Sequence, residues 1–431
     1  MNEPQTTPPR SSKLSENIFA PALEAKAEPM FLAIHAISDG AKGGYAERAY
    51  YSVSYQSQIL EEYLDLHGAN RNSRFHTIRY DVSGLKWVSK AISCLLLLKD
   101  GPSNYPTADR KWGQELLIGH VDVAIAYLQE NFAALITQLE MSWTEAGMAA
   151  IEHSQGEIDV HPPLPVLPAD LEDSYESDSL GDSKSPSPLY LTRFIRLYNR
   201  WDAEATKRLA ATSAAEDFMK SFCTEAIARS FESRMHSLQS DYDSHIRNTS
   251  HELASPNLRQ IRGAVSQSLH LLEAVTALTH LYERHRRHLH LSQVFSWDSL
   301  AAMIINHLVL PAYKCIESSI PVAESLLETL SPIECVEVRL PEGVEMHARP
   351  LSLIAGVVKH FGMEIEIECE GERANAASFM GMLVLIGSRP NCNRYKFFGC
   401  GAALNDIETL FELGLGELGL DKVTRALPYL K

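Results

Sequence analysis

The hydrophobic periodicity of the chain changes at residue 333, and this change divides the chain into two regions of different fold class. Before residue 330, apolar residues recur at steps of three and four, which is the spacing of one helix face; one such series is Ile125, Leu128, Phe132, Leu135 and Leu139. From Ile333 the segment IECVEVRL alternates apolar and charged positions, which is typical of a half-buried strand. At 431 residues the chain has room for roughly two or three domains.

The region after residue 333 shows a regular succession of short elements. The pattern predicts strands at 333–340, 363–369, 372–376 and 394–399, and a helix after the first, third and fourth of them. The order β-α-β-β-α-β-α belongs to an open-faced α+β sandwich, in which helices cover one face of a four-stranded antiparallel sheet.

The rest of the chain is predicted to be mainly α-helical, so the whole is a multidomain protein. Residues 1–28 are polar and contain prolines, which predicts a disordered tail with no signal peptide. Residues 29–330 are expected to form one helical bundle of unknown function. It is interrupted at 155–188 by a flexible, acidic, proline-rich insertion. Residues 331–431 form the α+β domain with a C-terminal extension.

The composition argues against several classes of partner and cofactor. The net charge is −16, which disfavours a chain-wide surface for nucleic acid or an anionic membrane. The most apolar run, 92–98, is far shorter than the roughly 20 residues of a membrane-spanning helix. The seven cysteines form no CxxC pair or metal-ligand spacing, so we expect free thiols, no metal, no cofactor and a cytoplasmic location.

The segment EGVEMHARPLSL, residues 342–353, places a histidine where a predicted strand gives way to a predicted helix. A helix that begins at Ala348 leaves its first N–H groups without partners, and an anion on His347 would lie against them. Arg349 adds a charge-assisted contact for phosphate oxygens, and Pro350 suits the first helical turn. These residues are compatible with a phosphorylatable imidazole, although their spacing alone favours an ordinary loop histidine before a helix-starting proline.

The segment 333–414 resembles the HPr family, the histidine-containing phosphocarriers of the bacterial phosphoenolpyruvate:sugar phosphotransferase system. MHARPLSL is similar to the active-site motif of that family. The resemblance implies that His347 is the phosphohistidine and that Arg349 clamps the phosphoryl group, while Ala348 and Pro350 support it at the helix start. It also implies an intracellular bacterial protein that acts as a phosphotransfer carrier rather than as a self-contained enzyme.

The segment NAASFMGMLVL resembles the second motif of the HPr family. Ser378 matches the serine that a dedicated kinase phosphorylates in some bacteria. Phe379 and Met380 match the apolar docking residues of that motif, and Leu383 extends this patch. The partners implied are an Enzyme I-type phosphoryl donor and an unknown acceptor or regulator protein.

Two departures from the family pattern leave a second hypothesis open. The family usually has glycine where this chain has Glu345, a carboxylate that would repel a phosphoryl group if it pointed at the imidazole. Ala377 replaces the basic residue that usually precedes the regulatory serine. The alternative to a carrier is therefore a non-catalytic interaction or scaffold protein, in which a degenerate HPr-like domain serves as a docking surface.

A histidine-rich segment, HLYERHRRHLHL at 280–291, is the remaining candidate for a metal site. His285 and His288 lie three residues apart, but no carboxylate or cysteine in the segment's pattern completes a ligand set, and the flanking arginines repel cations. The sequence favours a solvated helix end.

Overall fold

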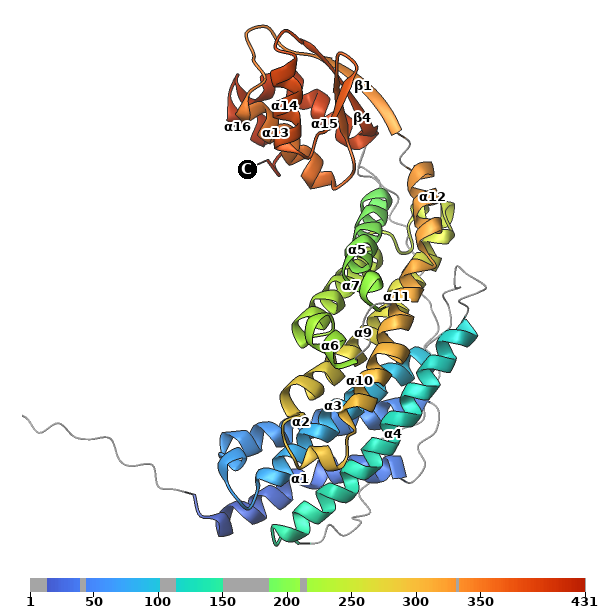
Figure 1. Cartoon of the computed structure of the whole chain (residues 1–431), viewed down its shortest axis with the longest axis vertical. Helices are drawn as coiled ribbons and strands as arrows, with labels where there is room; N and C mark the ends of the chain where they lie inside the picture. Colours follow the sequence, from blue (N-terminus) through green and yellow to red (C-terminus); the bar gives the residue numbers. More distant parts are fainter. Residues whose placement is uncertain are drawn as a thin grey trace, which may run out of the picture.

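The computed structural model of the chain describes residues 14–38, 44–100, 114–149, 186–209, 215–330 and 333–430. The first thirteen residues of the predicted tail and most of the predicted insertion lie outside these described residues. A helical region occupies the lower part of the molecule in Figure 1, and a smaller α+β domain lies above it.

The described part of the helical region contains long helices and several short ones. Its elements are α1 (Glu16–Ser38), α2 (Gly44–Leu66), α3 (His76–Asp100), α4 (Gln114–Glu145), α5 (Pro186–Leu209), α6 (Ala215–Ser221), α7 (Glu225–His245), α8 (Ser250–Ala254), α9 (Asn257–His285), α10 (Trp297–Ile304), α11 (Leu310–Glu317) and α12 (Ile320–Leu330), with 3₁₀ turns at Ala69–Arg71 and Leu291–Gln293 and a π-helical turn at Ile305–Val309.

Helix α3 is central to this region because it packs against α2, α4 and α9. The apolar series predicted for one helix face lies on α4, and all five of its side chains are buried. Helices α7 and α10 begin at N-caps that the sequence supplies. The Thr224 hydroxyl accepts from the Ile227 N–H and the Ser296 hydroxyl accepts from the Ser299 N–H, which satisfies groups that a helix start leaves unpaired.

The prediction of a disordered tail at residues 1–28 is wrong over its second half. Helix α1 begins at Glu16 and contains both Pro21 and Pro29. The reason is burial: Phe19, Leu23 and other apolar side chains of this segment enter the core against α2. A proline-containing sequence still forms a helix where such packing outweighs the lost hydrogen bonds.

The helical stretch Trp297–Leu330 is long and apolar enough to cross a membrane by length and composition. Its most apolar window is 67% buried within the protein. A buried core helix meets the same criteria of length and composition as a membrane span. The burial of this stretch is that of a core helix of the helical region.

The C-terminal domain contains the small four-stranded antiparallel sheet that the sequence predicts. The strand order is β1-β4-β2-β3, and every neighbouring pair is antiparallel. The elements are β1 (Ile333–Arg339), α13 (Ala348–Phe361), β2 (Glu366–Cys369), β3 (Glu372–Asn375), α14 (Phe379–Ser388), β4 (Arg394–Cys400), α15 (Gly401–Glu412), a 3₁₀ turn at Gly414–Gly416 and α16 (Leu420–Ala426).

One face of this sheet is covered by helices, as Figure 1 shows. On β4 the side chains of Tyr395 and Phe397 are buried, whereas those of the intervening Arg394 and Lys396 are exposed. The core of the domain shares no residue with the core of the helical region. A two-residue turn joins β2 to β3, where Glu370 and Gly371 both have positive φ (50° and 86°), as a tight hairpin of this kind requires.

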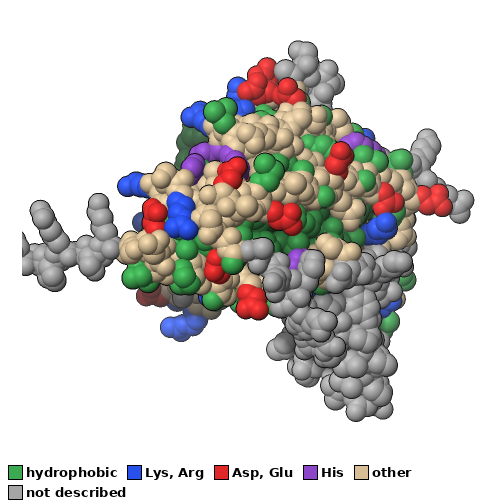
Figure 2. Space-filling model, turned by 90° about the horizontal axis from the view of Figure 1, so that it is seen from below, with side chains coloured by type: hydrophobic (Ala, Val, Ile, Leu, Met, Phe, Trp, Pro, Cys, Tyr) green, Lys and Arg blue, Asp and Glu red, His purple; other side chains and the backbone are tan. Residues whose placement is uncertain are grey.

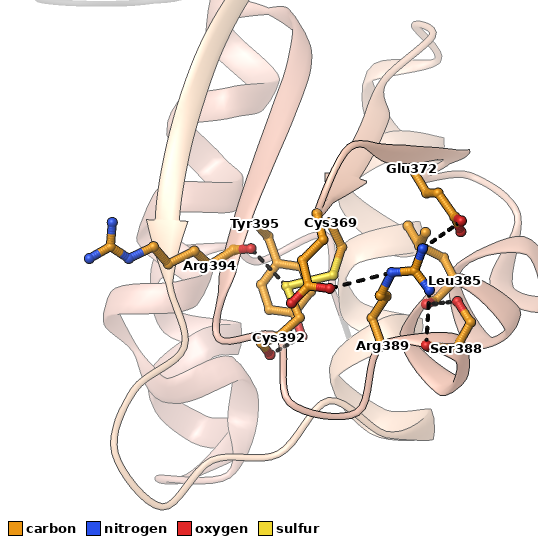
Figure 3. Close-up of a disulfide and its surroundings, with 9 residues drawn as sticks. Cys369, Glu372, Leu385, Ser388, Arg389, Cys392, Arg394 and Tyr395 are labelled. Atoms are coloured by element: carbon orange, nitrogen blue, oxygen red, sulfur yellow. Dashed lines mark hydrogen bonds and ion pairs between the residues drawn. A yellow bond between two sulfur atoms is a disulfide. The ribbon is translucent and has the colours of Figure 1, made fainter.

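Two cysteines of the C-terminal domain correct the expectation that all seven are free thiols. Cys369 at the end of β2 forms a disulfide with Cys392, which precedes β4 (Figure 3). Sequence spacing alone did not indicate the pair because the two residues meet only after the sheet forms. In the same corner Arg389 contacts Glu370 and Glu372, so the loop before β4 is held to the β2–β3 turn. Cys94, Cys223 and Cys335 are thiols.

Candidate functional site

His347 is the N-cap of α13, the helix that follows β1. Its backbone is extended, and its Nδ1 accepts a hydrogen bond of 3.4 Å from the Arg349 N–H. The helix therefore begins at Ala348, where the sequence pattern predicts a helix start. Ala348 and Arg349 are exposed in this first turn, and Pro350 is buried beneath it.

A carboxylate from a distant part of the chain completes the site. Oε1 of Glu417 lies 3.2 Å from Nε2 of His347 and 3.3 Å from Nη1 of Arg349. Glu417 follows a turn in which Gly414, Leu415 and Gly416 all have positive φ. The side chain of Leu415 is fully buried in the domain core, which anchors this turn beside the start of α13.

These contacts distinguish the two nitrogens of the imidazole. The lone pair that accepts from the Arg349 N–H is on Nδ1, so a neutral imidazole carries its proton on Nε2, 3.2 Å from the Glu417 carboxylate. The positive end of the α13 dipole favours negative charge at Nδ1. About half of the His347 side chain (48%) is exposed, so a partner protein can reach it.

Glu345, the carboxylate that the sequence suggested as a competitor, is exposed, and its side chain makes no hydrogen bond or ion pair with any described residue. The acidic group next to the imidazole is Glu417 instead. Sequence reasoning missed Glu417 because seventy residues separate it from His347. The available signal was ELGLGELGL, whose repeated glycines indicate a chain that turns sharply.

The residues of the second motif lie on α14 rather than beside His347. Ser378 is exposed and is the N-cap of this helix, since its Oγ accepts from the Gly381 N–H at 3.1 Å. Phe379 is half-buried, whereas Met380 and Leu383 are exposed. Val384, which was not predicted, is also exposed and extends the same apolar surface.

Several basic residues of the C-terminal domain are paired with carboxylates. Arg373 contacts Glu366 and Glu368, and Arg394 contacts Glu337. Such ion pairs reduce the positive charge that the sheet face presents to an acidic partner.

The histidine-rich segment of the helical region is not a solvated helix end, as the sequence had favoured. His285 is buried, with Nε2 3.2 Å from the Ser83 hydroxyl, and burial and the charge of Arg79 lower its pKa to about 3. His290 contacts the buried carboxylate of Asp81, and His280 contacts Glu225. These three imidazoles each contact a different polar side chain, and the described residues contain no group of three or more ligands able to hold a metal ion.

Comparison with known proteins gives one match. Residues 334–388 match the family model described as the PTS HPr component phosphorylation site, and the matched range contains both His347 and Ser378. No curated protein and no solved structure matches the chain. The sheet, the position of His347 and this match agree with one another: the C-terminal region of the chain is an HPr-like domain.

Proposed function

We propose that the chain is a phosphoryl carrier or regulatory protein in which His347 accepts a phosphoryl group from an Enzyme I-type donor. The observation that supports this most strongly is the pair of contacts on the imidazole. Nδ1 lies at the N-terminus of α13, and Nε2 is held by Glu417. The family match over 334–388 supports the same class of chemistry.

The transfer itself is a displacement at phosphorus. The Nδ1 lone pair of His347 attacks, an N–P bond forms, and the bond from phosphorus to the donor breaks, with its electron pair remaining on the donor. The ring becomes positively charged, and the carboxylate of Glu417 on Nε2 stabilises that charge. The reverse displacement passes the group to an acceptor.

Arg349 and Glu417 set how firmly the phosphoryl group is held. The guanidinium of Arg349 is suited to phosphate oxygens, but in this structure it contacts Glu417. The phosphoryl group must therefore compete with a carboxylate for the same arginine. Such competition favours a phosphohistidine that forms and then transfers readily, which is the requirement for a carrier.

The assay that tests this proposal is phosphorylation of the purified full chain with phosphoenolpyruvate and Enzyme I from the same organism. We expect an acid-labile, base-stable adduct that is absent in His347→Ala. The matched control is His360→Ala, which removes the exposed histidine at the other end of α13, where it stacks on Tyr429. An adduct that persists in His347→Ala, or no adduct in the wild-type chain, rejects the carrier function.

Substitution of Glu417 tests the competition for Arg349. Glu417→Gln keeps the size of the side chain beside Nε2 of His347 but removes the negative charge. We expect a larger phosphorylated fraction at equilibrium, measured by phosphate-affinity electrophoresis. A smaller fraction would mean that stabilisation of the positively charged ring outweighs repulsion of the phosphoryl group.

Ser378 is proposed as a regulatory phosphorylation site. Its hydroxyl is exposed at the start of α14, where the helix dipole favours a phosphate. Incubation with the HPr kinase of the same organism and mapping of the phosphorylated residue test this role. Modification of other serines only would contradict it.

The second candidate function is a non-catalytic docking protein in the cytoplasm. The observation in its favour is the exposed apolar surface of Met380, Leu383 and Val384 together with an Arg349 already engaged by Glu417. One experiment on the full chain distinguishes the two functions. A scaffold forms no adduct but binds its partner through this surface, so that Met380→Asp abolishes binding and His347→Ala leaves it unchanged.

A further inference from the structure

A groove rich in arginine lies between α5 and α7 in the helical region. It has a volume of about 430 Å³. Its walls carry four guanidinium groups, and its floor includes two buried leucines: Arg193, Arg196, Arg200, Arg234, Leu197 and Leu238. A concave site of this volume is in the range that small-molecule ligands occupy in proteins.

The charge in this groove is not balanced by the described part of the chain. One carboxylate, Asp241, lines it and is bonded to Arg193 at 2.6 Å. Arg234 donates only to the Ser230 hydroxyl, and neither Arg196 nor Arg200 pairs with a described carboxylate. Arg196 and Arg200 are four residues apart on one helix, a spacing at which like charges repel. An anion in the groove would remove this repulsion.

We propose that this groove binds a small molecule that carries at least two phosphate charges. Guanidinium groups present paired N–H donors that match phosphate oxygens, and here they converge from two helices on one cavity. The basic residues are confined to one groove between two helices, which favours a small molecule over nucleic acid, since nucleic acid is bound by an extended basic surface. The chain has a net charge of −16, so this concentration of positive charge is local.

The groove lies next to the HPr-like domain, because α5 is the helix directly below that domain in Figure 1. Gly362, the C-cap of α13, approaches Arg196 so closely that a Cβ at position 362 would lie 2.7 Å from its Nη1. A ligand that draws Arg196 into the groove therefore acts on a contact between the two regions. His347 lies at the opposite end of α13 and takes no part in the groove.

Isothermal titration of the full chain with sodium pyrophosphate tests the proposal. We expect saturable binding that Arg200→Ala and Arg234→Ala each weaken by about tenfold or more, since a charged hydrogen-bonding pair typically contributes about 1.5–3 kcal/mol. Arg200→Lys keeps the charge but not the paired donors and should weaken binding less. The matched control is Arg247→Ala, which removes an exposed arginine just beyond α7, outside the groove.

The outcome does not depend on the phosphocarrier function, because His347→Ala should bind pyrophosphate as the wild-type chain does. Circular dichroism establishes that each variant is folded. Absence of binding by the folded wild-type chain at millimolar pyrophosphate overturns the proposal, as does equal binding by all arginine variants. Displacement of pyrophosphate by an equimolar hexaglutamate peptide also overturns it, because the groove would then be a site for acidic peptides.

Discussion

The helical region and the HPr-like domain differ in whether they bury charged side chains. The helical region buries charged or ionisable side chains, among them Asp81, Glu252, Arg262 and His285. In the described part of the HPr-like domain Asp406 is the one acidic, basic or histidine side chain that is buried, and it accepts from the Tyr429 hydroxyl. The proposed functional residues of that domain, His347 and Arg349, are exposed.

This difference indicates what each region depends on for stability. A buried charge is tolerated only with partners, so the helical region depends on long-range pairs such as Arg262–Asp243. The HPr-like domain depends on apolar contact between one sheet face and its helices, and its charged side chains lie mostly on the surface. The exposed end of the helical region in Figure 2 shows acidic and basic side chains interspersed, without a continuous basic patch on its described part.

The largest loss of stability is expected from a substitution in the apolar core of the HPr-like domain. Phe397→Ala removes a fully buried ring that meets Phe411 edge to face at 5.8 Å and should cost about 4 kcal/mol. Because the two cores are separate, calorimetry should show a lower melting temperature for one transition only. Phe398→Ala, on the half-buried side of the same strand, is the control and should cost much less. A single shared transition would contradict the separation.

The corresponding substitution in the helical region removes a buried carboxylate rather than a buried aromatic ring. The Asp81 carboxylate accepts from Gln138 at 2.8 Å and from Ser142 at 2.7 Å, and contacts His290 at 2.9 Å. Asp81→Ala removes the carboxylate that these three groups share and should cost about 3 kcal/mol, measured by urea unfolding. Asp298→Ala, an exposed aspartate in the first turn of α10, should cost little.

Acid should destabilise the helical region selectively. The pKa of His285 falls to about 3 in the folded chain through burial and the nearby charge of Arg79, whereas an unfolded histidine titrates near 6.5. Between these values the unfolded chain takes up a proton that the folded chain does not, so stability falls with pH by up to about 1.4 kcal/mol per unit.

The measurement for this pH dependence is the melting temperature of each calorimetric transition between pH 7 and pH 4. His285→Gln should make the dependence of the helical transition shallower. The described histidines of the HPr-like domain, His347 and His360, are both exposed, so its transition should move less. Equal shifts of both transitions would argue against this difference between the regions.

The smallest loss of stability is expected from a substitution in the second motif, at the start of α14. Ser378→Ala removes the hydroxyl that caps α14 and should lower the stability of the HPr-like domain by about 1 kcal/mol. Ser352→Ala, at an exposed position within α13, provides the control because this serine caps no helix start. Equal effects of the two substitutions would show that the cap contributes nothing measurable.

The parts of this molecule that the sequence predicted are those with local causes. Alternation of apolar residues predicts β1 and β4, and the N-terminus of α13 follows from residues adjacent to His347. All of these depend on neighbours within a few residues.

The parts that the sequence did not predict come from chain segments that meet only after folding. Glu417 reaches His347 from the C-terminal extension, and Cys369 meets Cys392 across a sheet corner. Asp81 contacts His290, which lies 209 residues further along the chain. Residue types alone do not reveal such partners, because periodicity carries no information on which distant elements pack together.

The turn that carries Glu417 has a consequence for how the domain should be isolated. The family match ends at residue 388, before β4 and α15 and well before Glu417. A fragment cut at the end of the match would lack one strand of the sheet, and a fragment cut after α15 would keep the sheet but expose a histidine without its carboxylate. Fragments used to measure phosphorylation should therefore extend to the end of the chain, since a truncated domain would report the chemistry of a different site.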